Sequence, residues 1–349
     1  MAKTTKGNKT NKRLSIRVKW ILFMCSAIFL ALSASVLFNL YTVNGILEKD
    51  NMAVNKTNAD NAAAQVNLEL ANYANSLEQL AEITATDIKS ADSIARVDQA
   101  IHAIQEQNKN LISVYYMDFV SGKLHISPYV EFDKDVRETR TYKDLAKNPK
   151  TIWMDVYEDT TAHKIMTSVV TPVMSEGKMV GALGYDIDLS TIGEARTKIE
   201  NSSKSKLVIL DAQGFIVSSF MKEADGKNMN PAKSGTAEGV EDLVSNSTSF
   251  KKDLGWIEDI YSSSKNLTHD FSWEGKSYSG QVASIPELNW KVLSFTPDKV
   301  FLNKMDQVRN TGIFSILIGL LLGAILAIYL AEKLKKLISN FGSVIDENG

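Results

Sequence analysis

The sequence predicts an α+β protein: a long N-terminal helix followed by two tandem antiparallel-sheet modules, with a transmembrane helix on either side. Three observations predict this class. Two uncharged apolar runs have the length of a membrane span, a helical apolar pattern follows the first run, and paired strand patterns with glycine turns follow that. The chain has 349 residues and a formal net charge of −2, so its charge gives no sign of nucleic-acid binding.

The two apolar runs predict membrane spans at residues 20–43 and 312–331. A basic tail, residues 1–19, precedes the first run, and a lysine-rich stub, residues 332–349, follows the second. The positive-inside rule then places both termini in the cytoplasm and residues 44–311 outside, extracellular or periplasmic. The alternative for the first run is a cleaved signal peptide, but the run is longer than a typical signal core. Gly319 and Gly323 form a small-xxx-small pair that permits close helix approach and gives weak support for dimerisation.

Residues 44–107 contain no Pro and little Gly, which favours one long helix. Apolar residues recur along it at steps of three and four: Val66, Leu70, Tyr73, Leu77 and Leu80. This stripe indicates packing on another surface. The sequence leaves two surfaces open, namely the helix's own domain and a second subunit.

Two strand-rich modules follow, at residues 108–200 and 201–300. "LISVYYMD" and "KLVILD" each predict a strand that ends in an aspartate, Asp118 or Asp211, before a glycine turn and a second strand. The other end of each module predicts a second hairpin, "SVVTPVMSEGKMVGALGYDIDL" and "YSGQVASIPELNWKVLSFTPDKV". The shared order predicts two sheets of similar layout.

Asp186 and Asp188 end the strand of the first long hairpin. Because side chains alternate along a strand, both carboxylates point to the same face. A buried carboxylate is costly unless it is paired, so Asp186 is a candidate to line a pocket for a cationic group. We expect Asp188 to cap the helix that begins at Ser190. The alternative is that both aspartates are caps or solvated strand ends.

The chain resembles the double Cache (dCache) sensor of bacterial chemoreceptors and sensor kinases. "DVRETRTYKDL" looks like that family's Asp-Pro-Arg-x-Arg-x-Trp-Tyr element, and residues 152–189 are similar to its stretch from a Trp-x-x-x-Tyr element to a "GxxGxDIxL" strand. The resemblance implies PAS-like modules. The membrane-distal one, residues 108–200, would hold the ligand, and the membrane-proximal one, residues 201–300, would couple to the second span. It also implies a homodimer and the start of a HAMP-like linker in the stub.

Carried over from the family, an aspartate that pairs with a ligand's ammonium group falls on Asp186. The family's second arginine is replaced by Thr139 and its tryptophan by Thr141, while Arg137 occupies the first arginine's position. Arg140, one place off, is the candidate to bind a carboxylate in its stead, and the alternative is that it faces solvent. The expected ligand-binding residues are Asp186, Tyr142, Tyr157, Trp153, Arg140 and Tyr115.

The resulting prediction is a transmembrane chemoreceptor, the sensor portion of a methyl-accepting chemotaxis protein, for an amino acid or small carboxylate. The alternatives are the sensor half of a histidine kinase or cyclase, and an accessory membrane-anchored binding protein without its own output domain. No catalytic motif stands out, and the histidines lack metal-ligand spacing, so we expect no enzyme, no metal and no cofactor. The expected partners are a small ligand, the lipid bilayer and a second copy. Cytoplasmic signalling partners are expected only if the chain continues.

Overall fold

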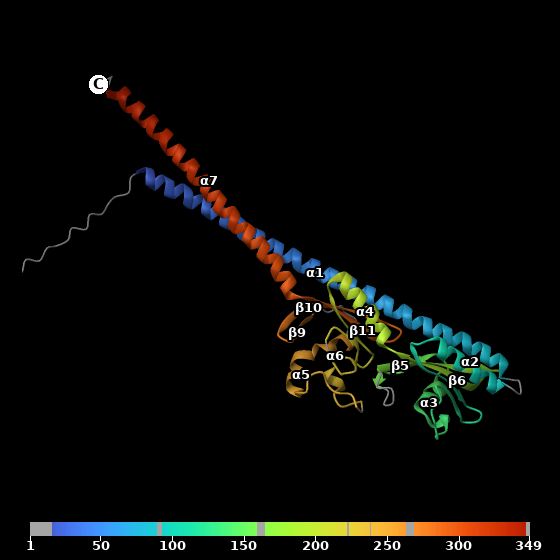
Figure 1. Cartoon of the computed structure of the whole chain (residues 1–349). Helices are drawn as coiled ribbons and strands as arrows, with labels where there is room; N and C mark the ends of the chain where they lie inside the picture. Colours follow the sequence, from blue (N-terminus) through green and yellow to red (C-terminus); the bar gives the residue numbers. More distant parts are fainter. Residues whose placement is uncertain are drawn as a thin grey trace, which may run out of the picture. The chain divides into compact units, whose positions relative to one another are not determined.

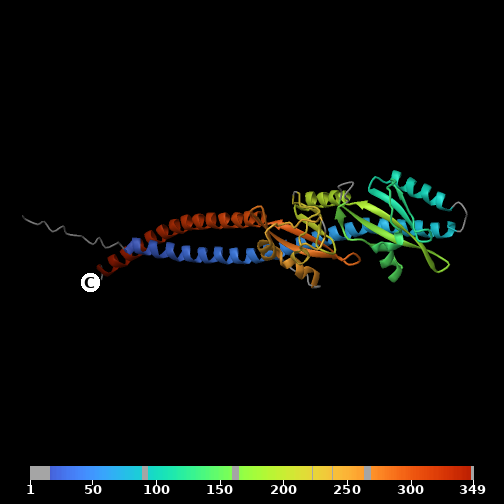
Figure 2. The same ribbon diagram turned by 90° about the horizontal axis from the view of Figure 1, so that it is seen from below.

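The computed structural model describes residues 16–88, 93–158, 165–221, 223–237, 239–262 and 269–346 (Figures 1 and 2). Most of the basic tail and the last residues of the stub lie outside these ranges. The chain divides into two compact units, one formed by Met1–Lys49 with Lys299–Gly349 and the other by Asp50–Asp298.

In the first unit, the N-terminal part of helix α1 (Ile16–Asp87) packs on helix α7 (Asp298–Asp346). Both helices contain stretches long and apolar enough to cross a membrane. The glycines of α7 form the contact, because a Cβ placed on Gly319 would lie 2.3 Å from Leu32 Cδ1, and one on Gly323 would lie 2.5 Å from Ile28 Cδ1. The close approach that the small-xxx-small pair predicts is therefore present, and its partner is α1 of the same chain.

In the second unit, the first module contains α2 (Ser93–Gln107), β1 (Leu111–Asp118), β2 (Leu124–Ser127), η1 (Val136–Glu138), α3 (Arg140–Lys147), β3 (Ile152–Trp153), β4 (Tyr157–Glu158), β5 (Ile165–Ser175), β6 (Lys178–Asp188) and α4 (Ser190–Ser203). The second module contains β7 (Lys206–Leu210), β8 (Ile216–Ser219), η2 (Pro231–Lys233), α5 (Ser247–Leu254), α6 (Trp256–Ser262), β9 (His269–Trp273), β10 (Lys276–Ile285) and β11 (Trp290–Pro297).

The two antiparallel sheets share one strand order. The first runs β2-β1-β6-β5-β3, with β4 also paired to β5, and the second runs β8-β7-β11-β10-β9. In each, the first strand of the opening hairpin pairs with the last strand of the closing hairpin, β1 with β6 and β7 with β11. The β5–β6 hairpin closes through Glu176 and Gly177, whose φ angles of 52° and 77° suit a two-residue turn. The predicted fold class, a long helix followed by two antiparallel-sheet modules, is confirmed.

Helix α1 provides part of the core of both modules, and Figure 1 shows it running along them. Val66 and Leu70 pack with residues of the second sheet, whereas Leu77 packs with residues of the first. The apolar stripe thus lies against the chain's own domain, which decides between the two surfaces that the sequence left open. The single helix expected over 44–107 is wrong, because α1 ends at Asp87 and α2 begins at Ser93. The separate helix α2 allows Val97 and Ile101 to cover the same sheet as Leu77.

The aspartate at the end of each first strand holds the following turn. Asp118 Oδ1 accepts the backbone N–H of Val120 at 2.8 Å. Asp211 Oδ1 accepts three backbone N–H groups, those of Gln213, Gly214 and Phe215, at 2.8–2.9 Å. Asp211 is fully buried, and its Oδ2 also accepts the Val156 N–H of the first module at 3.3 Å. The repeated Asp-turn explains the layout that the two modules share.

Asp211 makes folding stability depend on pH. Burial raises its pKa to about 6 against the opposing effect of the backbone N–H groups. Because the folded-state pKa lies above the unfolded one, this group's contribution to stability is complete below about pH 4 and is lost as the pH rises through 6. The Asp211→Asn variant cannot ionise there. Its unfolding free energy relative to wild type should therefore rise by about 2–3 kcal/mol between pH 4 and pH 7. Urea unfolding at both pH values measures this, and an unchanged difference would contradict it.

The glycine contact in the first unit predicts the effect of a large side chain. Gly319→Leu places bulk against Leu32, so we expect the helix pair to separate and the melting temperature in detergent to fall. Adding Leu32→Ala should restore part of the loss, because it removes the opposing atoms. Equal melting temperatures for Gly319→Leu with and without Leu32→Ala would show that this contact does not hold the pair together.

Candidate ligand-binding site

The strand register of the first sheet brings Asp186 between two serines. Asp186 on β6 lies opposite Ser113 on β1 and opposite Ser168 on β5. Directly opposed residues share a face of the sheet, so the three side chains form a row across it. The same face carries Tyr115, opposite Gly184, and continues into the apolar cluster around Leu145 of α3.

Both serines donate hydrogen bonds to the Asp186 carboxylate. Ser113 Oγ donates to Oδ2, and Ser168 Oγ donates to Oδ1 at 2.5 Å. The two serines are buried and Asp186 is partly buried. The Tyr157 hydroxyl lies 3.1 Å from Ser168 Oγ and extends the network toward β4. The carboxylate is therefore oriented by two neutral hydroxyl donors.

The negative charge of this cluster also acts on Tyr115. Burial raises the pKa of the Tyr115 hydroxyl well above its ordinary value, and the nearby Asp186 and Tyr157 raise it further, while a hydrogen bond with Ser168 lowers it. Tyr115 therefore remains a neutral phenol at physiological pH, able to donate a hydrogen bond.

Gly184 allows the Tyr115 ring to lie flat on the sheet beside Asp186. A Cβ at Gly184 would lie 2.2 Å from Tyr115 Cζ. Gly181 makes room for Tyr116 in the same way on the opposite face, where a Cβ would lie 2.4 Å from the Tyr116 ring. Tyr116 belongs to the core cluster under α1 and α2, so adjacent tyrosines of β1 serve opposite faces.

The other expected residues are only partly brought together with Asp186. Tyr142 lies on α3, packs on the cluster that includes Tyr115, and contacts Phe119 edge-on at a ring-centroid distance of 4.7 Å. Arg140 is mostly exposed, with Asp144 and Asp155 at 3.4 and 3.7 Å, and this geometry agrees with the solvent-facing alternative.

Trp153 does not join the Asp186 row. It pairs with Val169 on β5 and packs with the clusters under α1, on the opposite face from Ser168. The expectation that Trp153 lines the same pocket as Asp186 is corrected accordingly. Trp153 lies opposite Val169, and successive residues of a strand point to opposite faces, so Trp153 is not on the face of Ser168 and Asp186. Sequence reasoning also missed Ser113 and Ser168. The signal that identifies these serines is a polar residue within an otherwise apolar strand. Ser113 lies on the same face of β1 as Tyr115, and both serines lie opposite Asp186.

Asp188 lies one residue before the N-cap position of α4, which Leu189 occupies, so the expected cap is displaced by one residue. Its Oδ1 accepts the backbone N–H of Ser190, the first residue of α4, at 2.9 Å. The strand that carries Asp186 is thus tied directly to the helix that follows it.

Comparison with known proteins shows which proteins this chain is similar to. A family model described as Cache domain, dCache_1, matches residues 45–305. The methyl-accepting chemotaxis protein McpC of Bacillus subtilis is 21% identical over 254 residues, which cover 69% of this chain and 38% of McpC. The chain thus spans less than half the length of that relative.

Two solved structures have a similar fold. The ligand-binding domain of the Pseudomonas fluorescens chemoreceptor CtaA, in complex with L-isoleucine, is 17% identical with a TM-score of 0.54, covering 75% of this chain and 98% of that one. The ligand-binding domain of the Pseudomonas aeruginosa amino acid chemoreceptor PctC, in complex with GABA, is 18% identical with a TM-score of 0.50, covering 68% of this chain and 96% of that one.

The contact between Gly184 and Tyr115 predicts a coupled pair of variants. Gly184→Ala should lower the unfolding free energy by about 1–3 kcal/mol, because the new methyl group forces the ring to move. In a Tyr115→Ala background the same substitution should cost much less. Urea unfolding of the wild type, the two single variants and the double variant measures the coupling, and additive effects would contradict the contact.

Proposed function

Because the chain belongs to the Cache domain family, we propose that it is the sensor portion of a transmembrane methyl-accepting chemotaxis receptor. Its first module binds a small extracellular ligand, an amino acid or small carboxylate, and its role is binding without catalysis. The observation that carries the proposal is the Asp186 carboxylate, held by Ser113 and Ser168 at the end of a core strand.

The proposed topology places both termini in the cytoplasm and residues 44–311 outside. It is supported by the basic tail, by the lysines after the second apolar run and by the exposure of large apolar side chains on both helices, such as Phe38 and Leu321. In a bilayer these side chains would contact lipid. The first module is then membrane-distal and the second membrane-proximal, and the receptor acts as a homodimer.

The proposed ligand presents an ammonium group to Asp186. Tyr115, Tyr157 and Tyr142 contribute hydroxyl and ring contacts, since the first two already belong to the Asp186 network and the third packs beside it. CtaA was solved with L-isoleucine and PctC with GABA, and both compounds carry an ammonium and a carboxylate group. Arg140 is the residue that the sequence nominates to bind the ligand's carboxylate, and it would have to exchange its contacts with Asp144 and Asp155.

A path for the signal follows from the order of the elements. Asp186 and Asp188 lie on one strand, Asp188 is bound to the start of α4, and α4 contacts β7 and β8 of the second module. The last strand of that module, β11, runs directly into α7. A ligand shifts such a system only by binding one arrangement of these elements better than the other.

Binding to the full chain in lipid nanodiscs tests the proposal. We expect at least one compound in a panel of L-amino acids, GABA and small carboxylates to raise the melting temperature. Asp186→Ala should weaken the binding of that compound by about 100-fold, because it leaves the ligand's ammonium group unpaired. Asp259→Ala, at an exposed carboxylate of α6, is the matched control and should bind as wild type. A panel without a stabilising compound, or Asp186→Ala binding as tightly as wild type, would refute it.

A further inference from the structure

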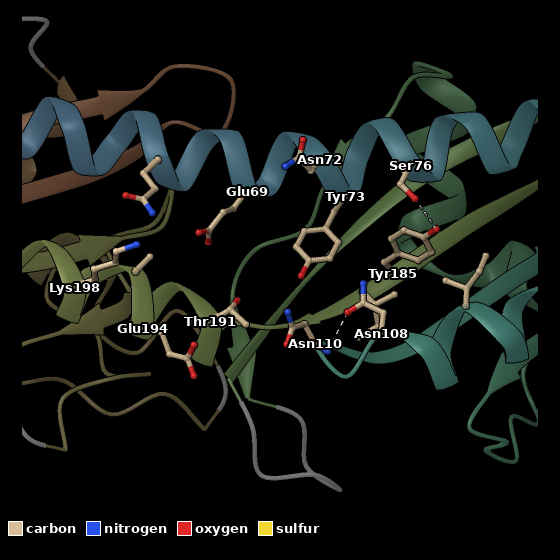
Figure 3. A pocket seen from close by; sticks show the side chains of 14 residues that line it. Glu69, Asn72, Tyr73, Ser76, Asn108, Asn110, Tyr185, Thr191, Glu194 and Lys198 are labelled. Carbon is tan, nitrogen blue, oxygen red and sulfur yellow. Dashed lines mark hydrogen bonds between the residues drawn. The ribbon is translucent and has the colours of Figure 1, made fainter.

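A cavity of about 590 Å³, shown in Figure 3, lies beside Tyr185, and adjacent residues of a strand put Tyr185 and Asp186 on opposite faces of the first sheet. Its walls are one face of α1, the α2–β1 junction and the first turns of α4. Tyr185, the neighbour of Asp186 on β6, forms part of its wall, and the Tyr185 hydroxyl lies 3.4 Å from Ser76 Oγ. The volume lies within the range of small-molecule sites in proteins.

The wall of this cavity is polar, although it lies beside the core. Figure 3 shows Glu69, Tyr73 and Asn72 of α1 across from Thr191 and Glu194 of α4. Val66 and Leu70, which directly follow Gln65 and Glu69 in the sequence, lie on the neighbouring apolar stripe of the same helix. Polar side chains of α1 and α4 therefore border one hollow beside the apolar core and offer hydrogen-bonding groups to a polar ligand.

The charges of the wall favour a cation. Two carboxylates, Glu69 and Glu194, and one ammonium group, Lys198, line the cavity. Glu69 is partly buried, and burial raises its pKa while a hydrogen bond with Gln65 lowers it. A carboxylate that loses solvent gains from a positively charged partner. The carboxamides of Asn108 and Asn110 and the Tyr73 hydroxyl add hydrogen-bonding groups around the same space.

We propose that this cavity, between α1, α4 and the α2–β1 junction, is a second ligand-binding site that takes a small organic amine with further hydrogen-bonding groups. Glu69 binds the ammonium group, Glu194 adds negative potential, and the amide and hydroxyl groups bind the polar atoms of the ligand. The site is separate in space from Asp186, because adjacent residues of a strand point to opposite faces.

The two sites share strand β6 and the start of α4. Tyr185 and Asp186 are consecutive, and Asp188 holds the N-terminus of the helix that supplies Thr191 and Glu194. An amine in this cavity would therefore alter the affinity of the Asp186 site, and linkage requires the reverse effect to be equal. Through this coupling, the amine would regulate how tightly the Asp186 site binds its own ligand.

Matched compounds test the proposal on the full chain in uncharged lipid nanodiscs. Isothermal titration calorimetry at pH 7 would use glucosamine against glucose and putrescine against butane-1,4-diol, pairs that differ chiefly in charge. We expect at least one amine to bind, with its neutral partner at least tenfold weaker. Glu69→Gln should weaken the binding of that amine at least tenfold, and Asp186→Asn should change it by less than twofold in the absence of an amino acid.

Lys198→Met is a second variant. It removes the only ammonium group among the described residues that line the cavity, so it should tighten amine binding. Failure of both amines to bind would overturn the proposal, as would equal binding of amine and neutral partner. An amine that loses affinity in Asp186→Asn and keeps it in Glu69→Gln would be occupying the first site, and that result also overturns it while leaving the proposed function intact.

Discussion

Burial of one apolar stripe of α1 against two sheets is the constraint on which the sensor unit depends. Ala59, Ala62, Val66 and Leu70 are almost fully buried with residues of the second sheet, and Leu77 with residues of the first. Neither sheet has a complete core without this helix, because each packs one of its faces on the stripe. The modules are thus two halves of one folded unit, in agreement with the division of the chain at Asp50 and Asp298.

Because side chains alternate along each strand, the two faces of the first sheet differ in chemistry. Residues of β6 alternate between the core under α1, with Leu183, Tyr185 and Ile187, and the face of Asp186. Gly181 and Gly184 differ in parity, so each face has one position where a tyrosine ring can lie directly on the backbone. A single strand therefore supports aromatic packing on one side and a charged network on the other.

Much of the fold follows from the sequence because its signals are local. The hairpins are marked by strand patterns around glycine turns, and Asp118 and Asp211 hold turns in both modules by the same backbone contacts. The end of α1 at Asp87 does not follow from the sequence, because apolar residues such as Ile83 continue the helical pattern although Ile83 is 64% exposed. Apolar periodicity shows which residues can be buried, but the surface that buries them is tertiary.

The site was predictable only where its residues are marked by local patterns in the sequence. Asp186 and Tyr115 follow from alternation along their own strands, whereas Ser113 and Ser168 depend on the register of three strands, which the sequence does not contain in readable form. Trp153 lies on a two-residue strand, too short for an alternation pattern to assign its face. Arg140 lies on the exposed side of α3, one turn from Asp144, so its positive charge is neutralised within the helix.

The helix pair of the first unit has a row of small residues at four-residue intervals: Gly319, Gly323 and Ala327. Leu32 occupies the notch at Gly319 and Ile28 the notch at Gly323. Sliding α7 by one helical turn would move Leu32 to Gly323 and Ile28 to Ala327, where small side chains again leave room. The same slide would also move Val36, which lies over Gly312, against the large side chain of Ile316, so the three glycine contacts together favour the single register that the structure shows.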